Sequence, residues 1–261
     1  MLLDPIRSVW DFSFYKSLPR KSLGAVTGYI AYLSVLFSFA FVAALYIYVR
    51  PVIADAVEWA AASVPTLTLT GGKLSSQLTA PVTVRHPKVP EAAIMIDTAR
   101  TEPVTAGEMA EKKVAAYLTQ NAAYLLTQSR LETYPFDKAA SKQPLVIDAS
   151  FYRTMGVALT RVLYPIAFVF TCVMFALWKH VAALIYSLPA LALNSGMSLG
   201  LDFPSLYKVA AYAQTPVIVL QALALFLPQR VAHFGIVGFA IVCAYLWKAL
   251  RAIQQDAQPA A

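Results

Sequence analysis

The feature that most limits what this chain can fold into is the uncharged run at residues 22–49. It contains 28 residues without Asp, Glu, Lys or Arg, and as an α-helix it would be about 42 Å long. A helix of that length crosses a bilayer with room to tilt. A secretory signal peptide has a shorter apolar core followed by a cleavage site, so the run predicts an uncleaved membrane anchor.

Composition also indicates a membrane protein. Hydrophobic residues make up 59% of the chain and charged residues 13%, whereas about 25% of a soluble domain is charged. The net charge of +7 raises the question of nucleic-acid binding. Residues 51–150, however, hold ten acidic and nine basic side chains, and the remainder holds four acidic and twelve basic ones. The basic excess therefore lies at the ends of apolar runs, where lipid headgroups are the expected contacts, and we expect no nucleic acid as a partner.

Four further apolar runs follow the region at 51–150. They cover residues 162–178, 180–201, 209–229 and 231–247, and each is long enough for one crossing. The sequence therefore predicts an α-helical integral membrane bundle of about five transmembrane helices, with a small α+β domain inserted after the first. The predicted segments are 1–21 (cytoplasmic and interfacial), 22–50 (first helix), 51–152 (extracytoplasmic domain), 153–249 (four-helix bundle) and 250–261 (polar tail).

The distribution of basic residues predicts the orientation. Four of them precede the first span, which places the amino terminus in the cytoplasm and residues 51–152 outside a bacterial inner membrane. Five crossings put the carboxyl terminus outside, although Lys248 and Arg251 argue for the opposite side. The least secure crossing is the third, because Pro189 and residues 194–196 interrupt it. If that segment is re-entrant, the tail returns to the cytoplasm.

The inserted region has the alternation and turns of a small sheet domain. Residues 66–70 (TLTLT) alternate with the period of a strand, and Gly71-Gly72-Lys73 supplies a hairpin turn. An amphipathic helix is predicted at 106–120, with Val114, Tyr117 and Leu118 on its apolar face. Further strands are predicted at 77–84, 92–97, 124–126, 129–134 and 145–147.

Polar residues within or beside the apolar runs are the candidate site residues, because burying them in lipid is costly without partners. Two explanations remain open: the side chains hydrogen-bond between helices, or they form a polar path for a solute or a partner helix. No carboxylate lies inside the runs, which disfavours a proton- or cation-coupled transporter. These candidates are Arg153, Arg161, Asn194, Ser195, Gln214 and Gln221.

The segment ahead of the first span alternates aromatic and charged residues. This pattern suits a short helix lying on the cytoplasmic interface, with rings among the headgroups and cations near anionic lipid. The predicted interfacial anchors are Trp10, Phe14, Tyr15, Lys16, Arg20 and Lys21.

Motifs for catalysis or cofactor binding are weak. Asp97-Thr98 occurs once, whereas an aspartic protease needs two such aspartates, so a strand-ending turn is the better interpretation. The three histidines, His86, His180 and His233, are not spaced as metal ligands. We therefore expect no enzyme, no metal and no cofactor.

Four motifs resemble a bacterial membrane protein family, number 1189 among the domains of unknown function, sometimes labelled as maltodextrin-utilization proteins. They are FSFYKSL at 12–18, VPTLTLTGGKL at 64–74, IMIDT at 94–98 and LYKVAAYAQTP at 206–216. The last is also similar to the Yip-type multispan domain. The resemblance implies an inner-membrane protein of five or nearly five spans, with an extracytoplasmic insert and no established catalytic residues.

Two functions follow as hypotheses. The first is a non-enzymatic scaffold or accessory subunit that presents the inserted domain to another membrane or periplasmic protein, through a sheet edge or the 106–120 helix. The second is a component of a transporter for a small polar or lipid-like solute, with a path along the interrupted third and fourth runs. Membrane lipid is a partner in both.

Overall fold

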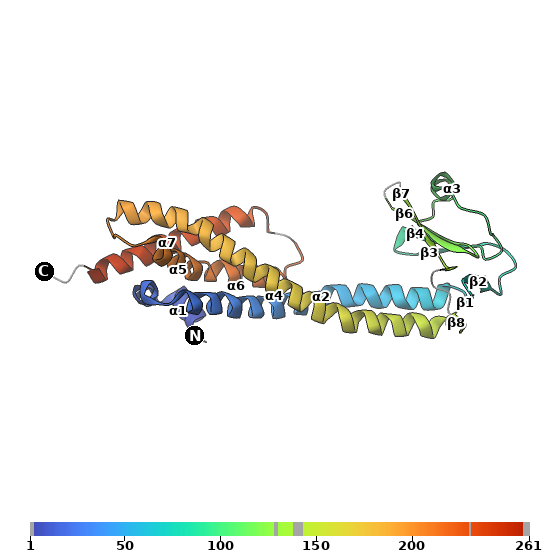
Figure 1. The fold of residues 1–261 in the computed structure, drawn as a ribbon, viewed down its shortest axis with the longest axis horizontal. Helices are drawn as coiled ribbons and strands as arrows, with labels where there is room; N and C mark the ends of the chain where they lie inside the picture. The colour runs from blue at the N-terminus through green and yellow to red at the C-terminus, as the bar shows by residue number, and fades with distance from the viewer. Residues whose placement is uncertain (1–2, 128–129, 138–142, 230, 258–261) are drawn as a thin grey trace. The chain divides into compact units, whose positions relative to one another are not determined.

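The computed structural model describes residues 3–127, 130–137, 143–229 and 231–257, except for the side chains of residues 90–92. The chain forms two compact units. Met1–Val49 and Val162–Ala261 make up the helical unit, and Arg50–Arg161 make up the sheet unit. Each unit is described separately below, with its elements labelled in Figure 1.

The helical unit contains six α-helices and one 3-10 helix among the described residues. Helices α2 and α4 run on into the sheet unit, whereas the others belong to the helical unit alone. The elements are α1 (Asp4–Trp10), η1 (Phe12–Arg20), α2 (Leu23–Ser63), α4 (Ala149–Gly196), α5 (Phe203–Ala213), α6 (Thr215–Ala224) and α7 (Phe234–Ala257).

Three helices in the described part of the chain are long and apolar enough to cross a membrane: α2, α4 and α7. The structure therefore does not support the expected count of five spans. The predicted second span, 162–178, and the predicted third span as far as Gly196 form one continuous helix, α4. The fourth is divided between α5 and α6, which have 11 and 10 residues, and a crossing helix needs about 20.

Local chemistry explains both differences. Lys179 alone separates the two predicted spans, but it donates a hydrogen bond to Gln221 at 2.8 Å, so its charge is accommodated within the helical unit. The helix also continues through Pro189 and ends at Gly196. Pro216 has no main-chain N–H, so it cannot donate the helical hydrogen bond to the carbonyl of Tyr212, four residues earlier. The Thr215 hydroxyl donates to that carbonyl instead, at 2.7 Å, where α5 ends and α6 begins.

The core of the helical unit lies around α5. Its residues Leu206, Val209 and Ala210 are completely buried, as are Leu246 and Leu250 of α7. In contrast, α4 exposes large apolar side chains such as Ile166 and Phe170, which are 61% and 64% exposed. A continuous apolar surface of this kind is typical of lipid contact.

The described part of the sheet unit holds two sheets. The strands are β1 (Leu67–Thr70), β2 (Lys73–Ser76), β3 (Val82–His86), β4 (Val89–Ile96), β5 (Ala116–Leu118), β6 (Ala122–Thr127), β7 (Arg130–Pro135) and β8 (Leu145–Ile147). A three-stranded sheet has the order β2-β1-β8, and a five-stranded sheet has the order β3-β4-β5-β6-β7. All pairs are antiparallel except β4 with β5.

The five-stranded sheet is covered on both faces. Because side chains alternate along β4, Ala93 and Met95 belong to the core that contains Met109 of α3 (Ala106–Glu111). Ile94 and Ile96 belong to the core that contains Leu67 of the three-stranded sheet. The α+β character expected from the sequence is therefore present in this unit.

The predictions for individual elements have mixed outcomes. The hairpin at Gly71-Gly72 is confirmed, with both glycines at positive φ. The strands predicted near 92–97, 124–126 and 145–147 are present as β4, β6 and β8. The segment expected as one strand at 77–84 contains only the start of β3. The strand expected at 129–134 is β7, and residue 129 lies outside the described residues.

The helix expected at 106–120 is wrong beyond Glu111. Lys113 has a φ of 52°, and residues 116–118 form β5 instead of continuing the helix. Val114 and Tyr117 are buried as the helical pattern suggested, but they reach the core from a turn and a strand. Pairing of β5 between β4 and β6 therefore outweighs local helical preference.

Glu108 is the centre of an ion-pair network in the sheet unit. Arg100 donates to both carboxylate oxygens, with its Nη2 at 2.9 Å from Oε2, and Lys112 donates at 2.8 Å. The hydrogen bonds from Arg100 and then Lys112 lower the pKa of Glu108 to about 2. The network ties α3 to the loop that follows β4.

We predict that Glu108→Gln lowers the melting temperature of the sheet unit by about 5 °C. Because the folded-state pKa is lowered, the stabilisation is complete above the unfolded pKa near 4.3 and disappears as the pH falls through about 2. Thermal unfolding of the full chain at several pH values measures this difference. The control is Glu111→Gln, an exposed neighbour, and an equal effect of both variants would refute the role of the network.

Gly156 allows α2 and α4 to pack closely within the sheet unit. A Cβ at this position would lie 2.7 Å from Cγ2 of Val57. We predict that Gly156→Leu destabilises the chain by about 1–3 kcal/mol through overpacking, and that Val57→Ala restores part of the loss. Thermal unfolding tests both. Gly196→Ala, where an added Cβ meets no atom within 4 Å, should change little.

Candidate binding site

A buried lysine on α4 is the most unusual polar group of the helical unit. Lys179 is 4% exposed, and a buried cation is costly unless it is paired. Its ammonium donates to Oε1 of Gln221 on α6 at 2.8 Å and lies 4.8 Å from the ring centre of Phe175. Both contacts are to neutral groups, and no carboxylate pairs with Lys179 among the described residues.

Gln214, at the junction of α5 and α6, is the second polar residue beside Lys179. It is 2% exposed, and its Nε2 donates to the main-chain carbonyl of Lys179 at 3.3 Å. That carbonyl can only accept, so the amide nitrogen must face it. The Oε1 atom is buried and has no hydrogen-bond partner in the described part of the chain. A buried acceptor of this kind needs a donor from elsewhere.

Lys179, Gln214 and Gln221 line one cavity of about 270 Å³ between α4, the α5–α6 junction and α7. Most of the other lining residues are apolar or aromatic: Trp178, Ala182, Ile185, Tyr186, Val217, Phe234, Gly235, Gly238, Phe239 and Val242. A mostly apolar cavity with a few convergent polar groups is typical of a small-molecule site.

A second cavity of about 340 Å³ shares Gln221 and Phe234 with the first. Its other lining residues are all apolar: Phe37, Phe175, Ala224, Leu225 and Val231. The two cavities are therefore adjacent, and together they offer a polar end and an apolar end.

The remaining polar candidates are in different surroundings. Asn194 is buried and exchanges two hydrogen bonds with the main chain of Leu201, each at 3.1 Å, which closes the loop after α4. Ser195 is exposed in the same region. Arg153 forms a bidentate ion pair with Glu58 of α2 at 2.9 and 3.1 Å within the sheet unit, and Arg161 is exposed. The six candidates therefore do not form one track.

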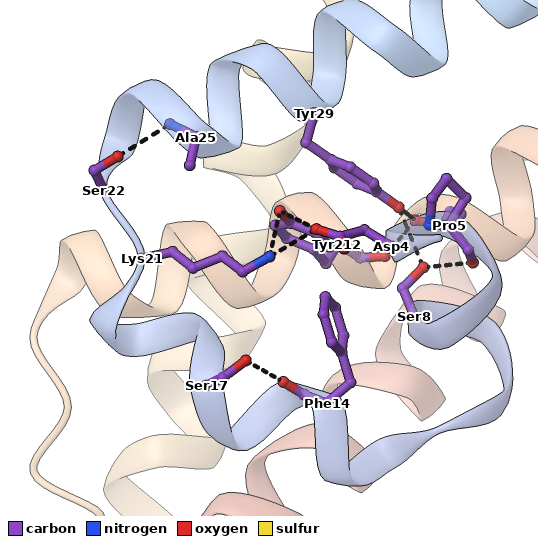
Figure 2. Close-up of polar contacts among 11 residues, drawn as sticks. Asp4, Pro5, Ser8, Phe14, Ser17, Lys21, Ser22, Ala25, Tyr29 and Tyr212 are labelled. Atoms are coloured by element: carbon purple, nitrogen blue, oxygen red, sulfur yellow. Dashed lines mark hydrogen bonds and ion pairs between the residues drawn. The ribbon is translucent and has the colours of Figure 1, made fainter. Parts of the chain in front are cut away.

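The amino-terminal segment is docked on the helical unit by a polar network, shown in Figure 2. Lys21 donates to the Asp4 carboxylate at 2.7 Å and to the Tyr212 hydroxyl at 3.2 Å. The ring of Tyr212 stacks on Tyr29 with centres 3.9 Å apart, and the Tyr29 hydroxyl hydrogen-bonds to Ser8 at 3.2 Å. Residues 4 to 29 are thus joined to α5.

This docking changes the role of several predicted interfacial anchors. Tyr15 is completely buried and donates to the carbonyl of Ser8 at 2.8 Å, so its ring does not lie among headgroups. Phe14 packs edge-on against Tyr212, and Lys21 lies over both of those rings. Trp10 is 82% exposed. Arg20 is exposed, and Lys16 pairs with Asp256 at 3.2 Å.

We predict that Asp4→Asn releases the amino-terminal segment. Burial alone would raise the pKa of Asp4, but the hydrogen bond and the charge of Lys21 outweigh it and lower the pKa. The stabilisation is therefore present above the unfolded pKa near 4 and is lost as the pH falls through the lower folded value. Tryptic cleavage at Arg20 at neutral pH should become several-fold faster.

Lys21→Met should have the same effect on cleavage, and the double variant should add little. Lys16→Met is the control, because the exposed pair with Asp256 contributes little. Unchanged cleavage in Asp4→Asn, or a stability difference from the wild type that persists at low pH, would contradict this role.

The sequence does not identify Lys179 as a site residue, because a lysine between two apolar runs indicates a boundary between two spans. The available signal was the spacing of Gln214 and Gln221, which are seven residues apart and share a helical face, with a lone lysine on the preceding helix. The neighbouring His180 hydrogen-bonds through its Nδ1 to the hydroxyl of Tyr207 on α5. Among the residues that the structure describes, no group of three His, Cys, Asp or Glu side chains could hold a metal ion.

These features define a mostly helical protein whose described residues include three helices long and apolar enough to cross a membrane and an inserted α+β sheet unit. The chain belongs to the family described as protein of unknown function (DUF1189), which matches residues 6–250. The resemblance drawn from the four sequence motifs is therefore confirmed. Neither a search of curated proteins nor a search of solved structures gave a significant match.

Proposed function

We propose that this chain is a membrane-embedded binding component of a transport system for a small polar or lipid-like solute, and that the solute occupies the cavity at Lys179. The observation that carries the proposal is a buried cation beside the buried, unpartnered carbonyl oxygen of Gln214. Both groups gain from a bound solute that supplies the missing acceptor and donor.

Binding without chemical conversion agrees with the lining of the cavity. The described residues that line the cavity include no Asp, Glu, His, Cys or Ser, so these residues do not form a nucleophile–base pair. The surrounding helices α4 and α7 are two of the three that are long enough to cross a membrane. Buried ionisable groups in such helices commonly mark the pathways of substrates.

Presentation of residues 51–152 to another membrane or periplasmic protein stays a prediction, as do the cytoplasmic amino terminus and the bacterial inner-membrane location. The outer strand β7 gives the scaffold hypothesis some support. It is an edge of the five-stranded sheet, and its Tyr134 is 52% exposed, which suits addition of a partner strand.

The test is to fill the cavity with a larger side chain and to identify any solute that no longer co-purifies with the protein. Ala182 lines the cavity and is 7% exposed, so Ala182→Phe places a ring in or beside it. Solutes that co-purify with the full chain in mild detergent are extracted and compared by mass spectrometry. We expect at least one solute to be enriched with the wild type and depleted by about tenfold or more in Ala182→Phe.

Ala192→Phe is the matched control, because this alanine is exposed on the same helix and does not line the cavity. It should retain the solute. If wild type, Ala182→Phe and Ala192→Phe carry the same solutes in the same amounts, the cavity is not a binding site and the proposal fails.

A further inference from the structure

The charge of the cavity restricts what it can hold. Lys179 is the only Asp, Glu, Lys, Arg or His side chain among the described residues that line it. A cationic solute would therefore meet a like charge, and a neutral one would leave the cation without a counter-ion. An anion is the occupant that compensates Lys179.

The hydrogen-bonding groups restrict the occupant further. An ammonium group has three N–H donors, and the described contacts of Lys179 use one of them, for Gln221. Gln214 Oε1 requires a donor. The complementary group therefore carries anionic oxygen acceptors with a hydroxyl, an ammonium or a protonated acid oxygen close to them.

The adjacent apolar cavity indicates that this polar group belongs to a larger molecule. Phe37, Phe175 and Leu225 line it, and it begins at Gln221 and Phe234, which both cavities share. A wholly hydrophilic anion would leave this apolar space without a contact. A hydrocarbon chain attached to the anion would fill it.

We propose that the site binds an anionic amphiphile, with its charged headgroup at Lys179 and Gln214 and its hydrocarbon chain in the adjacent cavity, against Leu225 and the stacked rings of Phe37 and Phe175. This inference rests on the proposed function and names the class of solute. A phospholipid phosphate and a fatty-acid carboxylate both supply the anionic oxygens, and a headgroup hydroxyl such as those of phosphatidylglycerol also supplies the donor for Gln214.

The deciding variant is Gln221→Glu. The two side chains have nearly the same shape, and the new carboxylate lies where Lys179 already donates at 2.8 Å, so it supplies an internal counter-ion. Full-length protein in a neutral detergent is titrated with phosphatidylglycerol, oleate and oleyl alcohol, and bound ligand is counted by native mass spectrometry. Phosphatidylglycerol and oleate distinguish a phosphate from a carboxylate headgroup.

We expect Gln221→Glu to weaken binding of the preferred anionic amphiphile by about tenfold or more, while binding of oleyl alcohol stays within about twofold of the wild type. Gln229→Glu adds the same charge at an exposed position outside both cavities, and it should bind like the wild type. Lys179→Gln removes the cation and should weaken binding of the anionic amphiphile as Gln221→Glu does. It keeps the test decisive if Gln221→Glu does not fold.

Anionic binding that is equal in the wild type, Gln221→Glu and Lys179→Gln would overturn the inference. So would preferential binding of oleyl alcohol by the wild type. In either case the proposed function still stands if Ala182→Phe depletes a neutral or cationic solute, because that experiment does not depend on the charge of the ligand. The two proposals can therefore fail separately.

Discussion

An apolar environment offers no hydrogen bonds, so the polar groups of the helical unit have to be satisfied by one another. Within α2, the hydroxyls of Ser34 and Ser38 donate to carbonyls four residues earlier. Tyr29 reaches Thr215 at 2.6 Å, and this contact joins α2 to the α5–α6 junction. The arrangement of the helices follows from where such partners lie as much as from apolar packing.

The amino-terminal segment shows how far this requirement extends. A lysine and an aspartate that precede the first long helix pair with each other beside Tyr212 of α5. The aromatic rings around them contribute cation–π contacts. A segment that looks amphipathic in sequence is thus an integral part of the helical unit, and α5 is covered by chain from both ends of the unit.

The sheet unit is stabilised in a different way. Its two small cores bury Met109 and Tyr117 on one face and Leu67 and Ile96 on the other. Its main ion-pair network lies at Glu108, where Arg100 and Lys112 remain partly exposed. Among the described residues, Arg100 Nε, Tyr164 Oη and Gln214 Oε1 are buried without a hydrogen-bond partner, and of these Gln214 lies beside the buried cation of Lys179 in one cavity. Local departures from complete satisfaction are typical of functional sites.

Four features could be predicted from the amino-acid sequence alone: the family, the apolar character of the long helices, the hairpin at Gly71-Gly72 and the mixed nature of the insert. These depend on local composition and on the periodicity of side chains. The sequence predicted two spans in residues 162–201, because Lys179 divides the apolar run. In the structure Gln221 accepts a hydrogen bond from Lys179, and the helix continues through this residue. The sequence also predicted a helix where β5 forms, because pairing with β4 and β6 involves residues distant in the chain.

The candidate site was decided by the tertiary structure. Gln214 and Gln221 were identified from their spacing, but their relation to Lys179, 35 residues before Gln214, depends on the packing of α4 against α5 and α6. The Oε1 atom of Gln214 lacks a hydrogen-bond partner because none of its described neighbours donates to it. Only the folded chain specifies those neighbours, and this is why the sequence could name the polar residues but could not assemble them around a cavity.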